Sequence, residues 1–325
     1  IDFENGTVNV EGTVYPLNDT FFPTIDPNNP YELTEDERAV MNSLSASIIN
    51  SERLQTHIRY MFSHGALYKR INGNLLFHGC IPMDENGDFL PVDIYGAKCA
   101  GRALMEHLDK QIRASYFTPE KIKKYGKPGD LMWYLWLAKD SPLFGKEKMT
   151  TFERLFIDDK ASHKEHVRPY YKLINSKEPC EKILREFGLD PSHSKILNGH
   201  VPVKIKNGES PIKGGGLLYV IDGGISKAYQ KQTGIAGYTF IFNSRFMALA
   251  EHKPYEPLKE DGTQKFFSPS MKTVDTLKTR MLVIDTDEGA ELLRQAEAVK
   301  RLVEAYKTGE IKERPEGKYS AYKGK

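Results

Sequence analysis

The spacing of apolar positions at the start of the chain predicts a hairpin followed by a long helix. Apolar and polar residues alternate at 8–10 and 13–15, on either side of Glu11-Gly12, a pair typical of tight turns. Thr34 and Glu37 then stand at the spacing of a capping box, which marks the start of a helix. That helix carries an apolar stripe with the 3.6-residue helical period. The stripe consists of Val40, Met41, Leu44, Ile48 and Ile49.

Short apolar runs bounded by turn residues predict strands within 74–82, 194–200, 217–224, 237–242 and 280–284. Between the first two runs, the stretch from about 98 to 187 is mostly helical in pattern. Its apolar segment 132–137 predicts a buried helix. A last amphipathic helix begins near a cap at Asp285 or Asp287. Its apolar positions are Leu292, Leu293, Ala296, Val299, Leu302, Val303 and Tyr306. This mixture of helices and short strands predicts an α/β (α+β) fold.

The composition limits the kinds of ligand and partner that we expect this protein to bind. The chain has 325 residues, of which 39% are hydrophobic and 28% charged, so it can bury a substantial core. No apolar stretch reaches the eighteen residues of a membrane span, and we expect no membrane partner. The 46 basic and 44 acidic residues leave a net charge of +2. Nucleic-acid binders usually carry a larger basic excess. We therefore expect a neutral small molecule or a compact anion as ligand, and no nucleic acid.

Cysteine usage bears on the compartment. Cys80, Cys99 and Cys180 are too few and too scattered for a disulfide framework or a cysteine-rich zinc site. This favours a reducing, cytoplasmic location. The sequence begins at Ile1 rather than methionine. A removed signal peptide would account for that, but the few thiols argue weakly against export. We expect instead that the chain is part of a longer protein.

Three apolar runs end in polar residues beside glycines, a pattern typical of functional sites. They end in His78-Gly79, in Gly199-His200 and in Asp222-Gly223-Gly224. Open α/β folds place their sites at the carboxyl ends of strands, and neutral imidazole is the commonest metal ligand in proteins. His78 and His200 are therefore candidate metal ligands. The alternative is that each is a hydrogen-bonded core residue, because two ligands alone do not make a stable metal site.

A second cluster is rich in positive charge. Arg154, Lys160, His163, Lys164 and Arg168 lie within fifteen residues, and such groups can hold a phosphate. A charge-balanced surface, with Asp158, Asp159 and Glu165 as partners, is the alternative. The segment 163–166 places two histidines three apart rather than four, so it does not match a zinc-protease helix. No phosphate-binding glycine loop and no nucleophile elbow occurs, and we assign no catalytic residue.

With these residues identified, the chain resembles the class III fructose-1,6-bisphosphatases, bacterial members of the calcineurin-like metallophosphoesterase superfamily. The resemblance extends over essentially the whole sequence. It is carried by the segments 76–82, 198–204 and 220–230, which contain His78, His200 and Asp222. The stretch 141–154, which begins Ser-Pro-Leu-Phe-Gly-Lys, is associated with this class rather than with the whole superfamily.

The resemblance implies a fold, a reaction and a cofactor. The fold would be part of a four-layer α/β/β/α sandwich with helical insertions. The reaction would be hydrolysis of the 1-phosphate of fructose 1,6-bisphosphate, to give fructose 6-phosphate and phosphate in gluconeogenesis. Two manganese ions would activate a hydroxide for in-line attack, and His78 and His200 would ligate the same ion. Cationic groups would hold the sugar or its second phosphate. These groups are Arg154, Lys160, His163, Lys164 and Lys227.

The chain departs from the superfamily pattern in one respect. The Asp-x-His, Gly-Asp-x-x-Asp-Arg-Gly and Gly-Asn-His motifs that complete the two-metal site are absent, and Gly73-Asn74 is followed by Leu75. We therefore expect the carboxyl-terminal half of a longer enzyme, inactive alone because two imidazoles cannot organise two metals. Its partner would be the missing amino-terminal half. The strand edge facing that half would be left open or covered by a homo-oligomer contact.

The expected organisation has two parts. Residues 1–250 would form the carboxyl-terminal part of the phosphoesterase domain, with a helical insertion at about 98–190. Residues 251–325 would form an extension with a closing strand and helix. Two other functions stay open. One is a non-catalytic binding or assembly subunit of a metallophosphoesterase. The other is a protein phosphatase, which the class-associated stretch beginning at Ser141 argues against.

Overall fold

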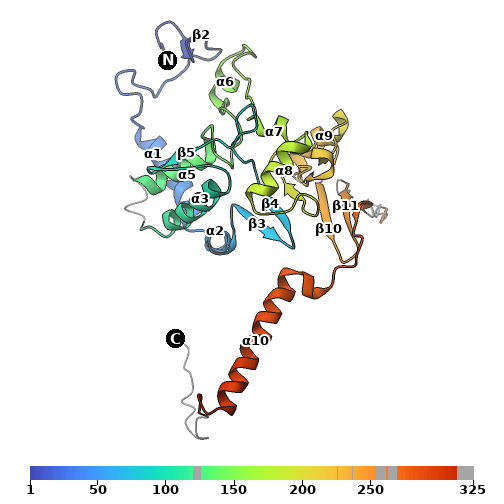
Figure 1. The fold of residues 1–325 in the computed structure, drawn as a ribbon. Helices are drawn as coiled ribbons and strands as arrows, with labels where there is room; N and C mark the ends of the chain where they lie inside the picture. The colour runs from blue at the N-terminus through green and yellow to red at the C-terminus, as the bar shows by residue number, and fades with distance from the viewer. Residues whose placement is uncertain (120–125, 225, 236, 254–260, 263–268, 313–325) are drawn as a thin grey trace. The chain divides into compact units, whose positions relative to one another are not determined.

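The computed structural model describes residues 1–119, 126–224, 226–235, 237–253, 261–262 and 269–312 (Figure 1). It divides into two compact units, Ile1–Gly237 and Tyr238–Lys325. We describe each unit by itself. The predicted domain boundaries at 250 and 251 and the four-layer arrangement stay predictions.

The chain opens with the predicted hairpin. Strands β1 (Thr7–Val10) and β2 (Thr13–Pro16) pair antiparallel, with Val10 opposite Thr13. Glu11 and Gly12 between them have φ angles of 51° and 88°. Two successive positive φ values define the type I′ turn, whose twist matches that of the paired strands. The sequence prediction of a turn at this pair is confirmed.

The predicted capping box starts the first long helix, α1 (Glu35–Ile49). The Thr34 hydroxyl accepts from the Glu37 amide at 3.3 Å, and the Glu37 carboxylate accepts from the Thr34 amide at 2.9 Å. A second helix, α2 (Glu52–His64), follows directly. Neither helix has a buried residue. The predicted stripe of α1 is therefore present but uncovered, with its five side chains 52–63% exposed.

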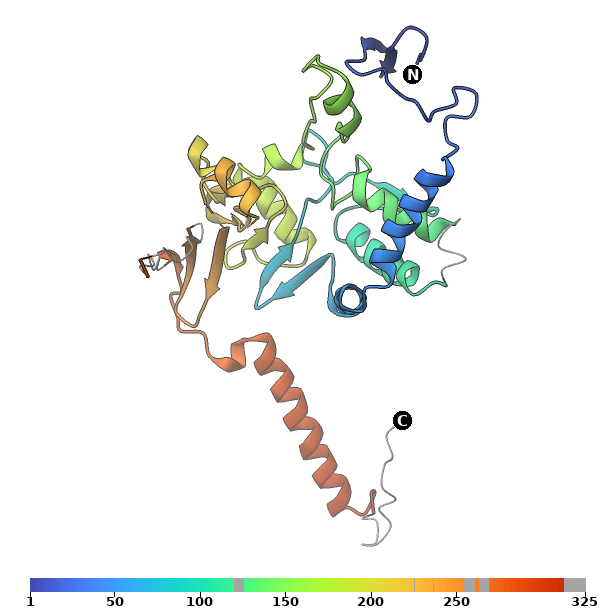
Figure 2. The same cartoon turned by 180° about the vertical axis from the view of Figure 1, so that it is seen from behind.

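A five-stranded sheet organises the larger unit. Its order is β3 (Tyr68–Ile71), β4 (Asn74–Phe77), β7 (Ile196–Asn198), β9 (Leu218–Val220) and β8 (Ile212–Lys213). The central strands β4, β7 and β9 are parallel, with antiparallel β3 and β8 at the edges. Figures 1 and 2 show the β3–β4 pair from both sides. Leu75, Ile196 and Leu218 are fully buried in neighbouring register. The three predicted buried strands are confirmed, and their carboxyl ends meet at one edge.

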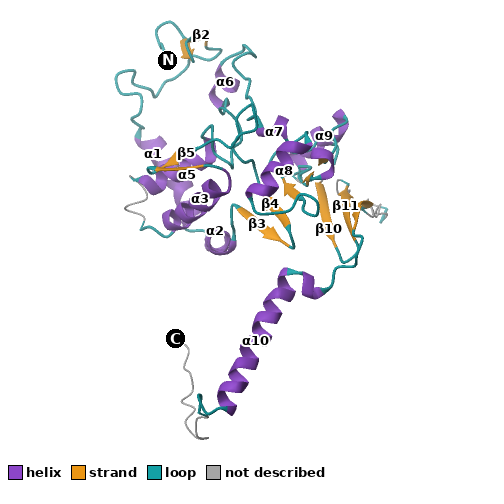
Figure 3. Ribbon diagram, viewed as in Figure 1, coloured by secondary structure: helices purple, strands orange, loops and turns teal. Residues whose placement is uncertain are grey.

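Helices dominate the segment between β4 and β7, as predicted (Figure 3). They are α3 (Gly101–Tyr116), α5 (Lys127–Leu137), α6 (Thr151–Phe156), α7 (Tyr170–Leu173) and α8 (Lys177–Glu186). A small hairpin, β5 (Val92–Ile94) with β6 (Ala97–Cys99), precedes them. Helix α3 packs against both α2 and α5. Short turns η1 (Ile205–Asn207) and η2 (Gly214–Gly216) and helix α9 (Lys227–Thr233) complete the unit.

The helix predicted at 132–137 is confirmed, but its predicted burial is only partial. This segment lies within α5, of which only Leu131 and Leu135 are buried. Trp133 and Trp136 are 60% and 58% exposed. Leu131 and Leu135 are four residues apart, so they share one helix face. A continuous apolar run supplies more apolar positions than that single packed face can cover.

The second unit contains a three-stranded sheet and a long helix. Strands β10 (Gly237–Phe242), β11 (Phe246–His252) and β12 (Ser270–Thr276) lie in that order, and β11 pairs antiparallel with β12. Only β10 was predicted. The predicted strand at 280–284 is wrong, because Val283–Asp285 forms a 3-10 turn, η3. The predicted final helix is confirmed as α10 (Asp287–Lys307). Its cap is Thr286 rather than Asp285 or Asp287.

These elements make an α/β fold. Among the described residues, no helix combines the length and the apolar character that crossing a lipid bilayer requires. The tail beyond residue 312 lies outside the described residues.

Candidate functional site

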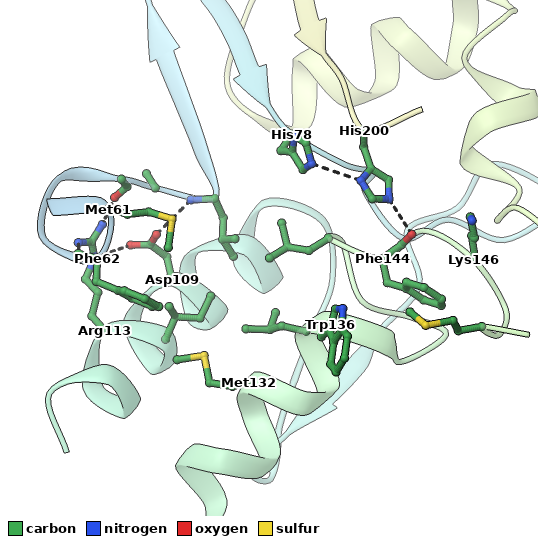
Figure 4. Close-up of a pocket in the computed structure, with 17 residues that line it drawn as sticks. Met61, Phe62, His78, Asp109, Arg113, Met132, Trp136, Phe144, Lys146 and His200 are labelled. Carbon is green, nitrogen blue, oxygen red and sulfur yellow. Dashed lines mark hydrogen bonds and ion pairs between the residues drawn. The ribbon is translucent and has the colours of Figure 1, made fainter. Parts of the chain in front are cut away.

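Two histidines meet at the carboxyl ends of the parallel strands. His78 directly follows β4, and His200 lies two residues beyond β7. The Nε2 atom of His78 is 3.2 Å from Nδ1 of His200. The two rings lie nearly edge to face, at an interplanar angle of 74° (Figure 4). The two candidate ligands from the sequence are therefore neighbours in space, while their role toward a metal stays a prediction.

The backbone around the pair fixes this approach. The Gly199 amide donates to the His78 carbonyl at 2.9 Å, which ties the two strand ends together. His200 itself has a φ of 69°. Residues other than glycine rarely adopt that left-handed backbone conformation, and those that do are often found at functional sites.

Gly79 brings a loop close to the histidines. A Cβ atom at Gly79 would lie 2.2 Å from the Pro142 carbonyl oxygen, so only glycine permits this approach. The Cys80 amide donates to the same carbonyl at 2.8 Å. Two residues further on, the Phe144 carbonyl oxygen lies 2.9 Å from Nε2 of His200. A carbonyl can only accept, so Nε2 carries the proton and Nδ1 presents its lone pair toward His78.

The surroundings favour the neutral form of His78. Burial lowers the pKa of His78, and a positive charge on His200 would lower it further. Asp222, two residues beyond β9, acts in the opposite direction on that pKa. Its carboxylate accepts from the Gly224 amide at 2.8 Å. A neutral imidazole is the form that binds a metal ion.

The pair fits part of a metal site. Ligands at about 2.0–2.1 Å from one ion, at angles between roughly 90° and 110°, lie about 2.8–3.4 Å apart. The observed 3.2 Å falls in that interval. The hydrogen bond from His200 to a backbone carbonyl is the outer-shell contact typical of ligating histidines. Among the described residues, however, no group of three or more His, Cys, Asp or Glu side chains is placed to hold an ion.

A hollow of about 700 Å³ lies beside the histidines, and both contribute to its lining (Figure 4). Its other walls come from the end of α2, from α3 and α5, and from the loop at 143–149. They are mainly apolar, and include Met61, Phe62, Ile112, Met132, Trp136 and Met149. Such a surface suits an apolar occupant and does not suit a sugar carrying two phosphates.

The charged side chains in this lining are already paired. Arg113 lies 2.9 Å from the Asp109 carboxylate and donates to the Phe62 carbonyl at 2.6 Å. Asp109 also accepts from the Leu67 amide at 3.1 Å. Lys146 lies 2.8 Å from Glu165. The contacts to Phe62 and Leu67 tie α3 to the segment at the end of α2.

The predicted phosphate-binding cations lie elsewhere, since none of those described lines the hollow. Arg154 donates to the Thr150 hydroxyl and to the His163 carbonyl, each at 3.0 Å. His163 contacts the Ile157 carbonyl through Nε2 at 2.7 Å. Lys160 and Lys164 are exposed. Lys227 begins α9, but its side chain lies outside the described part of the chain. Their role toward a substrate stays a prediction.

The alternative of a charge-balanced surface holds for Glu165. Its carboxylate accepts from Lys146 and from the Thr150 hydroxyl, and Arg154 lies 3.7 Å away. Burial alone would raise the pKa of Glu165, but these hydrogen bonds outweigh it and lower the pKa to about 2. Asp158 instead accepts from the Asn18 amide group.

Sequence reasoning missed the Phe144 carbonyl and the hollow. The stretch that begins at Ser141 was singled out only for its resemblance to a family, and a backbone acceptor has no sequence signal of its own. Cys80, next to this loop, is no candidate nucleophile, because burial raises the pKa of its thiol to about 12.

Comparison with known proteins places this α/β chain in a class of phosphatases. The chain belongs to the Firmicute fructose-1,6-bisphosphatase family, whose model matches residues 1–308. Curated relatives named fructose-1,6-bisphosphatase class 3 include proteins of Fusobacterium nucleatum, Clostridium botulinum (strain Alaska E43 / Type E3) and Clostridium tetani. They are 48%, 51% and 49% identical over 96% of this chain. The matched region covers 48%, 48% and 47% of those relatives. The chain thus spans about half the length of the curated relatives it matches. No solved structure matches it.

Proposed function

We propose that this chain supplies part of the active centre of a metal-dependent fructose 1,6-bisphosphate 1-phosphatase. The observation that carries the proposal is the approach of His78 Nε2 to His200 Nδ1, at 3.2 Å, in a chain of this family. The two nitrogens face each other, and an ion bound between them would displace the proton on His78 Nε2. We assign both to one ion of a two-manganese site, in a fold that is one part of a four-layer phosphoesterase sandwich.

The remaining ligands come from polypeptide outside these 325 residues. Two observations support this. The described residues offer no third ligand beside the pair, and the curated relatives are about twice as long as the matched region. When bound, manganese supplies Lewis-acid stabilisation of charge on the phosphoryl group. This chain's contribution is to hold two neutral imidazoles in place. The Phe144 carbonyl does this for His200 by fixing its tautomer and its ring direction.

The apolar hollow has a separate role in this proposal. Because its lining is mainly apolar and its charges are paired, it does not bind the sugar bisphosphate. We infer that it seats an apolar face of the same outside polypeptide, which thereby carries its own ligands to His78 and His200. The sugar or its second phosphate is assigned to the cations Arg154, Lys160, His163, Lys164 and Lys227. Of these, Lys160 and Lys164 are exposed.

A chimera tests the proposal in one polypeptide. This chain replaces the matching segment of the Clostridium tetani relative, and phosphate release from fructose 1,6-bisphosphate is measured with manganese alongside metal content. We expect turnover with two metals bound. His78→Gln and His200→Gln should each reduce turnover by more than the roughly 10–100-fold typical of an outer-shell change, and the metal content should fall from two ions toward one. His166→Gln, at an exposed histidine, is the matched control.

Three results would contradict the proposal. Turnover by the unfused 325-residue chain with two metals bound would mean that its own residues complete the site. A folded chimera that binds manganese without hydrolysing the substrate would favour the alternative of a binding or assembly subunit. Preference for a phosphopeptide over the sugar bisphosphate would instead indicate a protein phosphatase.

A further inference from the structure

The loop at 140–147 carries the Phe144 carbonyl, and a second segment of the chain holds this loop in place. The Arg168 amide donates to the Gly145 carbonyl at 3.0 Å. Directly beside that hydrogen bond, the two segments pair through an isolated antiparallel contact. The carbonyl that contacts His200 is therefore one residue away from a fixed backbone contact.

The side chain of Arg168 joins the two ends of the same loop. Its Nη2 atom lies 3.0 Å from the Asp140 carboxylate, and its Nη1 atom lies 3.6 Å from the Glu147 carboxylate. The Arg168 side chain is only 11% exposed. A guanidinium presents several donors in one rigid plane, so it can contact two carboxylates at once. We call this link from Asp140 through Arg168 to Glu147 the Arg168 bridge.

We propose that Arg168 is a positioning residue for the histidine pair, acting on His200 through the loop. By joining the loop ends, the Arg168 bridge keeps the Phe144 carbonyl 2.9 Å from Nε2 of His200. That contact holds the proton on Nε2 and leaves Nδ1 unprotonated toward His78. The effect on the ring of His200 stands on the contacts alone. Its consequence for a bound metal rests on the proposed function.

Phosphate binding is the other role open to Arg168, because it belongs to the basic cluster found in the sequence. Its surroundings oppose that role. Carboxylates of Asp140 and Glu147 already lie beside the guanidinium, and they would repel an incoming anion. The side chain is also mostly buried, so a phosphate would have to displace its present partners. The contacts therefore favour a role within the protein.

NMR of the 325-residue chain, with its histidine nitrogens labelled, tests the Arg168 bridge without any metal. At about pH 8.5 the imidazoles are neutral, and the nitrogen shifts report which nitrogen carries the proton. His200→Gln assigns the signals of His200 by removing them. In the unchanged chain, Nε2 should appear as the protonated nitrogen. Arg168→Gln should shift both nitrogens of His200 toward the average of the two tautomers. Unchanged shifts in a folded Arg168→Gln chain would overturn the proposal.

Two further variants separate the bridge from the charge of Arg168. Arg168→Lys keeps the charge, but a single ammonium does not reproduce the planar fork that joins two carboxylates. It should therefore show the same shift as Arg168→Gln. Asp140→Asn combined with Glu147→Gln removes both partners and should also show the shift. Those two side chains are 41% and 43% exposed, so this double variant should fold even if Arg168→Gln does not. A tautomer restored by Arg168→Lys, or unchanged in the double variant, would refute the bridge.

Arg102→Gln is the matched control. It also removes a guanidinium that pairs with a carboxylate, that of Glu106 on α3, at 2.8 Å. Neither residue belongs to the loop at 140–147, so the His200 signals should not change. A shift of the same size in this control would mean that the loss of any ion pair disturbs the ring, and it would contradict the role of Arg168.

The manganese dependence of the chimera tests the consequence for the metal. Arg168→Gln should raise the manganese concentration for half-maximal phosphate release by about tenfold, the lower end of outer-shell effects, and saturating manganese should restore turnover. An unchanged manganese requirement would overturn the link to the metal. A loss that saturating manganese does not restore would instead give Arg168 a direct role toward the substrate. If the unchanged chimera fails to turn over, the proposed function fails, while the NMR result still decides the Arg168 bridge.

Discussion

His78 and His200 are 122 residues apart in the chain, yet their facing ring nitrogens lie 3.2 Å from each other. The parallel pairing of β4 with β7 makes this possible, since it aligns the ends of two distant strands. The loop at 141–144 then orients one of the rings through the Phe144 carbonyl. The arrangement can be altered without touching either histidine, by changing the residue that lets this loop approach.

Gly79→Ala should disturb the contact between His78 and His200 without replacing either histidine. Its Cβ atom would meet the Pro142 carbonyl at 2.2 Å, so the backbone of the loop must move. We expect the free energy of unfolding to fall by about 2–4 kcal/mol. Urea denaturation measures this. Nitrogen-detected NMR of the imidazoles should show that Nε2 of His200 loses its preference for the proton.

Gly73→Ala is the control for that change. Gly73 precedes the same strand, and its Cβ atom would meet nothing within 4 Å, although its φ is 76°. We expect only the backbone cost of about 1–2 kcal/mol and an unchanged His200 tautomer. The same tautomer shift in both variants would mean that the loop contact does not orient the ring.

The stability that Glu165 contributes to the fold should depend on pH. Its pKa is about 2 in the folded chain, against an ordinary value of 4.5. A carboxyl with a lowered folded pKa stabilises fully above its unfolded pKa, and this stabilisation is lost as the pH falls from about 4.5 toward 2. Glu165→Gln should therefore reduce the free energy of unfolding by about 1–3 kcal/mol at pH 7.

The pH dependence separates this effect from a general loss of packing. The difference between Glu165→Gln and the unchanged chain should shrink between pH 4.5 and 2, as measured by urea denaturation at each pH. Glu181→Gln, which removes a carboxylate paired with Lys177 and Arg185 on the surface of α8, should change little. A constant difference at every pH would contradict the role assigned to Glu165.

The three thiols should react in two classes. Cys80 and Cys180 are buried, and burial raises the pKa of each thiol to about 12. At pH 8 only about one in ten thousand of such groups is a thiolate, which is the reactive form. Cys99 is only partly buried. Ellman's reagent should find one fast thiol in the folded chain and three after unfolding. Cys99→Ser should abolish the fast phase, and a second fast thiol in the folded chain would be inconsistent with the buried positions.

The Thr34 cap should contribute a larger share of the stability of α1 than a helix cap usually does. No residue of α1 is buried, so packing contributes little to this helix and Thr34 contributes proportionately more. Thr34→Ala should cost the helix about 0.5–2 kcal/mol. Hydrogen exchange should show faster exchange across 35–49. Ser47→Ala, inside the same helix, is the control. Equal protection in the Thr34 variant would show that something other than the cap holds α1.

Local signals predicted the parts of the fold that depend on local physics. The Thr34–Glu37 box and the Glu11-Gly12 turn each involve neighbouring residues, and both are confirmed. Strand β11 was missed because Met247, Ala248, Leu249 and Ala250 are helix-favouring residues that the sheet holds in an extended form. The run at 280–284 shows the reverse error. It is apolar, but Leu282, Val283 and Ile284 are more than half exposed, and no strand among the described residues pairs with them.

The same distinction applies to the site. His78 and His200 could be found because a histidine and a glycine interrupt apolar strands. The Phe144 carbonyl could not be found, since every residue has a carbonyl and only the three-dimensional path of the loop selects one. Gly79 permits a close approach, but a glycine in the sequence does not show which segment approaches it. The hollow forms because α2, α3 and α5 lie together. No sequence motif in these helices predicts that packing.

The uneven packing of α5 has an optical consequence. The chain contains two tryptophans, Trp133 and Trp136, and both are more than half exposed on this one helix. All indole fluorescence therefore originates beside the hollow, and water around both rings should place the emission at long wavelength. Trp136 lines the hollow, whereas Trp133 does not contribute to that lining. With Trp133→Phe, a single indole remains, and its emission moves to shorter wavelength only when something dry fills the space against it.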